Sequence, residues 1–98
     1  MKTSELNGTA LDWAVAKALG EYKPVAVPAY STDWAQGGPL IEREGVGLAY
    51  DEEQWWARVE VFNGWWSGDT PLIAAMRCYV VSKLGDAVEI PDRLKQNA

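Results

Sequence analysis

The chain has 98 residues, a length that fits one domain, and a net charge of -5 from 9 basic and 14 acidic residues. An acidic surface repels phosphate groups, so this balance argues against DNA, RNA and anionic membranes as partners. The chain has no histidine, which excludes Ser–His and Cys–His catalysis and removes the commonest metal ligand. We therefore expect a non-enzymatic protein that needs no cofactor or metal.

Two features of the sequence bear on its compartment. Cys78 is the single cysteine and can build no disulfide framework, which fits a reducing environment. The polar start, Met1–Leu6, lacks the apolar core of a signal peptide, and no apolar run is long enough to cross a bilayer. These features predict a cytoplasmic protein whose residues 1–98 form a single domain.

The first half of the chain predicts one helix followed by irregular structure. Apolar residues recur at helical spacing over Thr9–Leu19, and Gly20 follows as a C-terminal stop. Tyr22–Tyr30 is rich in β-forming residues but carries two prolines, which favours an edge strand or an extended segment. Ser31–Pro39 is predicted to be a loop, and Leu40–Glu44 a short strand.

Strand patterns dominate the middle of the sequence. Tyr50–Gln54 is predicted to be an acidic turn. Trp55–Phe62 alternates between two faces and is predicted to be a strand, with Asn63-Gly64 after it as a tight turn.

The last third predicts the central helix of the fold. Thr70 is a suitable N-cap, a proline follows at the first helical position, and Leu72–Leu84 is apolar over more than half of its circumference. A last short strand is predicted over Ala87–Ile90, and the tail from Asp92 is polar. The fold class that follows is α+β, with two helices packed on a small, mostly antiparallel sheet.

Three segments carry a resemblance to a known family: Leu11–Lys17, Tyr30–Gly45 with its Asp-Trp-Ala-Gln-Gly-Gly-Pro run, and Asp69–Gly85. In this order they resemble the small NinX-like proteins of tailed bacteriophages and prophages, over nearly the whole chain. Tyr50–Trp66 is the least family-like stretch. The family is one of unknown function. The resemblance therefore implies a phage accessory protein made inside an infected bacterium, and it implies no particular activity.

Trp34 is the most suggestive residue for binding. It lies in the predicted loop beside an acid, an amide and a glycine pair, an arrangement that can hold a planar ring and bond its edge. Packing into the core is the alternative role for this indole. The candidate ligand-binding residues are Tyr30, Ser31, Thr32, Asp33, Trp34, Gln36, Gly37, Gly38, Glu42, Arg43, Glu44 and Arg77.

Each neighbour of Trp34 has a functional and a structural interpretation. The Gly37-Gly38 pair could form a backbone nest for an anion, or a plain turn. Glu42 and Glu44 would share one face of the predicted strand, where with Asp33 they could hold a cation, or they could be a solvated face. Arg77, rising from an apolar helix, could meet a phosphate or an acidic side chain.

Two tryptophan pairs, Trp55-Trp56 and Trp65-Trp66, support a second hypothesis. Adjacent strand residues point to opposite faces, so one member of each pair must face away from the core, toward another layer, a ligand or a second subunit. We also expect a homo-oligomer.

The first functional hypothesis is a protein that binds a small planar, nucleotide-derived ligand, and that sequesters a host defence signal. The alternative is an inhibitor or adaptor that docks on a host protein through exposed tryptophans. A metal-dependent hydrolase is a third. A concave site at Trp34 would favour a ligand, and a flat or convex surface a protein partner.

Overall fold

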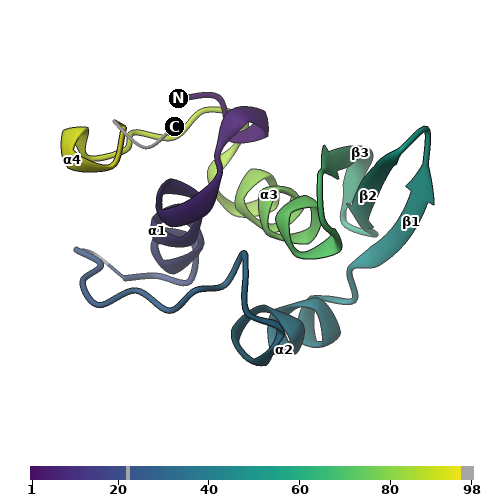
Figure 1. Cartoon of the computed structure of the whole chain (residues 1–98), viewed down its shortest axis with the longest axis horizontal. Coiled ribbons are helices and arrows are strands. Elements are labelled where there is room, and N and C mark those ends of the chain that lie inside the picture. The colour runs from purple at the N-terminus through teal and green to yellow at the C-terminus, as the bar shows by residue number, and fades with distance from the viewer. Residues whose placement is uncertain (22, 96–98) are drawn as a thin grey trace.

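The computed structural model describes residues 1–21 and 23–95 and confirms an α+β fold. Its elements are, in chain order, the 3-10 turn η1 (Thr3–Glu5), helix α1 (Gly8–Ala18), helix α2 (Trp34–Glu44), strands β1 (Gly47–Asp51), β2 (Gln54–Val59) and β3 (Phe62–Gly68), helix α3 (Pro71–Leu84) and the short helix α4 (Asp92–Lys95). Figure 1 shows α3 in the middle, with α1 on one side and the sheet on the other.

Helix α3 is the central element, as its sequence predicts. The hydroxyl of Thr70 accepts a hydrogen bond from the backbone N–H of Ile73 at 3.1 Å, and Pro71 stands at the first helical turn. Its fully or nearly buried residues are Leu72, Ala74, Ala75, Met76, Cys78, Tyr79, Val80 and Val81. Because α3 is apolar around most of its circumference, it can pack against the sheet and against α1 and α2 at once.

The helices differ in number and place from the two predicted on the sheet. The helix predicted over Thr9–Leu19 is confirmed as α1, which packs on α3, and α3 makes the extensive contacts with β2 and β3. The additional helix is α2. The loop predicted over Ser31–Pro39 is present only at residues 31–33 and is wrong from Trp34, and the strand predicted over Leu40–Glu44 is wrong, because residues 34–44 are helical.

The sheet is antiparallel in the order β1-β2-β3. Glu52 and Glu53 form the turn between β1 and β2, both with positive φ. The strand predicted over Trp55–Phe62 is too long, and the turn predicted at Asn63-Gly64 is wrong because those residues lie inside β3. The chain turns instead between β2 and β3 at residues 60–61, which sets Trp66 opposite Ala57 in the ladder.

The remaining predicted segments have little regular structure. Residues 23–30 form no strand, so the edge strand predicted over Tyr22–Tyr30 is absent from these residues, and Ala26 there has a φ of 49°. Ala87 makes an isolated bridge with Lys2 in place of the strand predicted over Ala87–Ile90. The polar tail begins with the helical turn α4. Tyr22 and residues 96–98 of the tail lie outside the described residues.

Candidate functional site: the outer surface of helix α2

Trp34 is the first residue of α2, and its side chain is 53% exposed. The helix begins here because the carboxylate of Asp33 accepts a hydrogen bond from the backbone N–H of Ala35 at 2.9 Å, which caps the N-terminus. A half-exposed indole at a capped helix start is held in place by the backbone and remains accessible from outside.

A buried contact with α1 fixes the chain just before α2. The backbone N–H of Ser31 donates to Oδ1 of Asp12 at 2.7 Å, and both residues are buried. Burial raises the pKa of the Asp12 carboxyl, and the hydrogen bonds from Ser31 partly oppose that rise. A carboxylate buried at this point secures the segment that positions Trp34.

The two glycines of α2 face different surroundings. Gly37 is buried, and a Cβ there would overlap the carbonyl oxygen of Tyr30 and lie 2.7 Å from Cδ2 of Leu72. Gly38 is only partly buried, and a Cβ there would meet ring carbon Cε3 of Trp34 at 3.7 Å, an ordinary contact. The pair forms neither the nest nor the turn that the sequence predicts, because both residues lie inside a helix.

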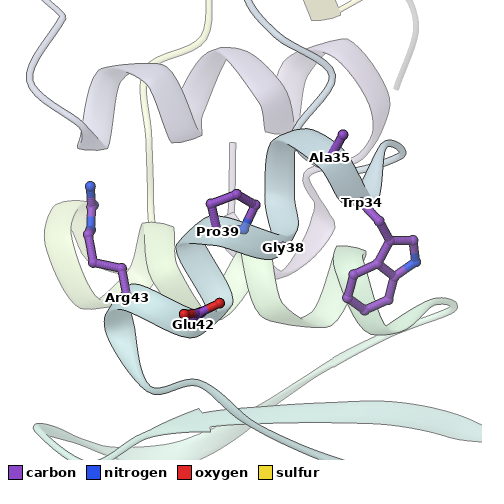
Figure 2. A pocket seen from close by; sticks show the side chains of 6 residues that line it. All are labelled: Trp34, Ala35, Gly38, Pro39, Glu42 and Arg43. Atoms are coloured by element: carbon purple, nitrogen blue, oxygen red, sulfur yellow. The ribbon is translucent and has the colours of Figure 1, made fainter.

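The outer side of α2 carries an open depression of about 720 Å³. We call its lining the α2 surface: Trp34, Ala35, Gly38, Pro39, Glu42 and Arg43. Figure 2 shows that these side chains project from one helix and diverge, with the indole of Trp34 and the guanidinium of Arg43 at opposite ends. The α2 surface is therefore a ridge with shallow flanks, and it has no second wall.

A smaller cleft lies on the other side of Trp34, between the starts of α2 and α3. Its volume is about 210 Å³, and it is lined by Ser31, Thr32, Trp34, Thr70, Leu72 and Ile73. The indole of Trp34 thus lines both depressions. The structure brings the candidate residues Ser31, Thr32 and Trp34 together here. The N-cap of α3, Thr70, and two residues of α3 complete the lining.

The carboxylates of this region do not converge. In a helix Glu42 and Glu44 point about 160° apart, so they do not share the face predicted for a strand, and Asp33 lies about 14 Å from Glu42 along the axis. Glu44 pairs with Arg43 at 2.9 Å and with Lys83 at 3.9 Å. Within residues 1–21 and 23–95, no three or more His, Cys, Asp or Glu side chains are grouped so that they could hold a metal ion.

Arg77 is a structural residue remote from this surface. Its Nε donates to the carbonyl oxygen of Leu6 at 2.8 Å and its Nη1 to that of Ser67 at 2.9 Å. Burial lowers the pKa of its guanidinium. Among the described residues Arg77 makes no ion pair at or below 4.0 Å with an acidic side chain. Arg77 therefore ties the N-terminal segment to β3.

The other candidate residues divide between the core and the surface. Tyr30 is partly buried and packs against the core, while Gln36 is exposed on the first turn of α2. Ala35 and Pro39 belong to the α2 surface although the sequence did not single them out. Asp33 is a suitable N-cap and could have predicted a helix that starts at Trp34. The Gly-Gly-Pro run predicted a loop instead.

The tryptophan pairs behave as the alternation predicts. Trp55 and Trp66 pack against the core, while the outer face of the sheet carries Trp56 and Trp65. The guanidinium of Arg58 lies 5.7 Å from the ring of Trp65, which is 48% exposed. One member of each pair therefore faces away from α3.

Two further features of the sequence can be compared with the structure, the single cysteine and the length of the apolar helices. The Cys78 side chain is fully buried, and burial raises the pKa of its thiol to about 11, so it acts as the small hydrophobic residue that the sequence predicts. Within residues 1–21 and 23–95, none of the helices has the length and apolar character that crossing a membrane requires.

Comparison with known protein families identifies this chain's family. The family model described as "Bacteriophage P22, NinX" matches residues 2–83, which include every element from η1 to the last turn of α3. The matched range also contains all twelve of the candidate residues. A search of curated proteins finds no match.

Proposed function

The chain belongs to the bacteriophage P22 NinX family, and on this premise we propose that it is a phage accessory protein that docks on a host protein through the α2 surface. The observation that carries the proposal is the position of Trp34. Its indole is 53% exposed on a ridge and stands between two shallow depressions. Tryptophan is one of the residues enriched among the side chains that carry most of the binding energy at protein interfaces.

The shape of the surface supports a protein partner over a small ligand. Ligand sites of about 300–1000 Å³ enclose most of the ligand and direct a few polar groups toward it. The larger depression has a volume in that range, but it is lined by one helix whose side chains diverge. The cleft beside it is about 210 Å³, below that range.

The chemistry of the surface matches an interface centre with a polar rim. Trp34, Ala35 and Pro39 supply apolar area, and Glu42 and Arg43 supply exposed charges of both signs at the far end of the helix. The partner that fits has an apolar pocket for the indole and charged groups that complement Glu42 and Arg43. Inhibition or recruitment of that host protein would be the biological result.

Binding of a small planar, nucleotide-derived ligand, with sequestration of a host defence signal, is the second candidate. The observation in its favour is the apolar cleft between Trp34 and Ile73, where one edge of a flat ring could enter beside the hydroxyl of Thr70. A complete ligand would have to extend over the α2 surface.

A capture experiment tests the first proposal with a matched control. Tagged wild-type protein, Trp34→Ala and Trp65→Ala would be incubated with bacterial host lysate, and bound proteins would be identified by mass spectrometry and then tested as purified components. Trp65 is the suitable control because it is also a half-exposed tryptophan, on the sheet. We expect a direct partner whose affinity for Trp34→Ala is at least about tenfold lower than for wild type, as for an interface anchor. Its affinity for Trp65→Ala should equal that for wild type.

The same proteins distinguish the second candidate. Tryptophan fluorescence and thermal melting would be recorded across nucleotides, cyclic nucleotides and NAD-derived compounds. Saturable quenching of the fluorescence and a raised Tm, both lost in Trp34→Ala only, would favour a small ligand over a protein partner. Equal binding of one purified partner by Trp34→Ala and wild type would reject the α2 surface as the docking site.

A further inference from the structure

The two edges of the sheet differ in what covers them. At the β3 edge, Nη1 of Arg77 bonds the carbonyl oxygen of Ser67, and Gly68 lies against the backbone of α3 at Ala74. At the β1 edge, no backbone hydrogen bond joins β1 to any described element other than β2. Figure 1 shows β1 as the outermost strand. The β3 edge is therefore covered by α3 at its end, Ser67–Gly68, whereas the β1 edge presents unpaired backbone groups.

The direction of the free groups follows from the hairpin. A two-residue turn at Glu52-Glu53 closes on the pair Asp51–Gln54, which is hydrogen-bonded in such hairpins. Because bonded and non-bonded pairs alternate, the N–H and C=O groups of Leu48 and Tyr50 point away from β2. The β1 edge therefore offers two donors and two acceptors, evenly spaced along a strand with no proline or bulge.

Most side chains of β1 are exposed, and only Leu48 is partly buried against the core. Leu48 and Tyr50 lie on the same face of the sheet as Ala57 and Trp55, the face that packs on α3. The helix contacts β2 and β3, and β1 lies beyond it, so Tyr50 remains 60% exposed, with its ring 5.4 Å from that of Trp55. The apolar face of the sheet continues past the helix that covers it.

We propose that the β1 edge pairs with β1 of a second copy of this chain, in antiparallel register centred on Ala49, to form a continuous six-stranded sheet. This register sets Leu48 opposite Tyr50 of the second copy, and Tyr50 opposite its Leu48. Their outward groups then bond each other in two reciprocal pairs. The exposed Tyr50 ring gains an aliphatic neighbour across the strands.

Charge complementarity selects a second copy as the occupant. In the same register Asp51 lies opposite Gly47 of the second copy, and Gly47 is paired with Arg58 inside each chain, on one face of the sheet. Gly47 has no side chain, and a depression of about 270 Å³ opens there, lined by Gly45, Gly47, Arg58 and Glu60. In the dimer the carboxylate of Asp51, which accepts from the backbone N–H of Glu52 at 3.0 Å, and the guanidinium of Arg58, which lies over the ring of Trp65, share one face with only Gly47 between them, twice by symmetry.

Sedimentation velocity of the full chain over roughly 1–500 μM tests the dimer, because small interfaces associate weakly and this range covers micromolar dissociation constants. Ala49→Lys places two ammonium groups opposite each other on the two-fold axis and should weaken dimerisation at least about tenfold. Asn63→Lys adds the same charge to the exposed side of the β3 edge and should leave the dimer unchanged. Circular dichroism would verify that both variants fold.

The register has its own test, independent of the first. Asp51→Arg or Arg58→Asp alone should weaken the dimer several-fold, and the double variant should regain most of the loss, because it restores opposite charges across the interface. Hydrogen exchange of the wild type should slow at the amides of Leu48 and Tyr50 as concentration rises. A monomer throughout the range, or a dimer that Asn63→Lys weakens and Ala49→Lys does not, would overturn the proposal.

Discussion

The two sides of helix α2 differ in how much freedom their residues have. On the inner side Gly37 touches the carbonyl of Tyr30 and the side chain of Leu72, with no room for another carbon. On the outer side Gly38 has free space, and Trp34 and Arg43 are exposed. The inner side positions the helix, and the outer side is available for binding. Substitutions on the two sides should therefore affect different measurements.

The largest effect is expected at the inner glycine. Gly37→Ala should lower the free energy of unfolding by about 2–3 kcal/mol, at the upper end for overpacked sites, because the new Cβ overlaps backbone that cannot move aside cheaply. Urea denaturation measures this change. A loss below about 0.5 kcal/mol would mean that α2 can shift away from α3, and the contrast between the two sides would disappear.

The two arginines among the candidate residues also differ in how firmly the structure holds them, and substituting them should change stability less than Gly37→Ala. Arg77→Met should cost about 1–2 kcal/mol, because the carbonyl oxygens of Leu6 and Ser67 lose their donor while the methionine keeps most of the packing. Arg43→Met removes only a surface ion pair with Glu44 and should change stability by less than about 0.5 kcal/mol. Thermal or urea unfolding of both variants provides the comparison, and equal losses would contradict it.

The outer glycine should respond in the opposite direction from the inner one. Gly38→Ala should raise the free energy of unfolding by about 0.5–1 kcal/mol, because alanine is the better helix former and its Cβ meets only a ring carbon at 3.7 Å. Paired with Gly37→Ala in one urea experiment, it isolates packing from helix propensity. If both substitutions lower the free energy of unfolding equally, the two glycines would act through the backbone of α2 as a whole and not through their different surroundings.

The smallest effect concerns pH and the buried carboxyl that secures the start of α2. Burial raises the folded-state pKa of Asp12 above its ordinary value of 3.8, so the protonated form is favoured in the folded state. The stability that this group contributes is fully present below 3.8 and is lost as pH rises through the raised folded-state pKa. Relative to Asp12→Asn, the wild type should therefore gain stability as pH falls toward 3.8.

Urea titrations of both proteins at several pH values measure this difference. Wild type that loses stability relative to Asp12→Asn on acidification would show that the hydrogen bonds from Ser31 outweigh burial. Asn keeps a carbonyl oxygen to accept from Ser31, which makes it the matched replacement.

The sequence was most informative where local signals and packing agree. Thr70 and Pro71 begin α3 as predicted, and its unbroken apolar character makes it central. The alternation around Trp55-Trp56 and Trp65-Trp66 correctly requires one indole of each pair to face outward. The family also follows from the sequence, since the resemblance and the family model agree over residues 2–83.

The candidate site was predicted in composition and not in shape. Trp34, Gly38, Glu42 and Arg43 were all proposed from the sequence, and all line the α2 surface. Their arrangement was not foreseen, because Gly-Gly-Pro is a strong loop signal in isolation. Arg77 was proposed because an arginine can bind a phosphate. Only the structure shows that its guanidinium donates hydrogen bonds to two backbone carbonyl oxygens.

The sequence by itself therefore determined the α+β class, the helices α1 and α3, the inward and outward division of the tryptophans and the phage family. Only the tertiary structure decided that residues 34–44 are helical and that β1 ends the sheet uncovered. For the helix, the physical reason is a tertiary contact. Local propensity counts the cost of Gly37 and Pro39 in a helix, but the contact with Leu72 that favours the helix comes from residues far along the chain.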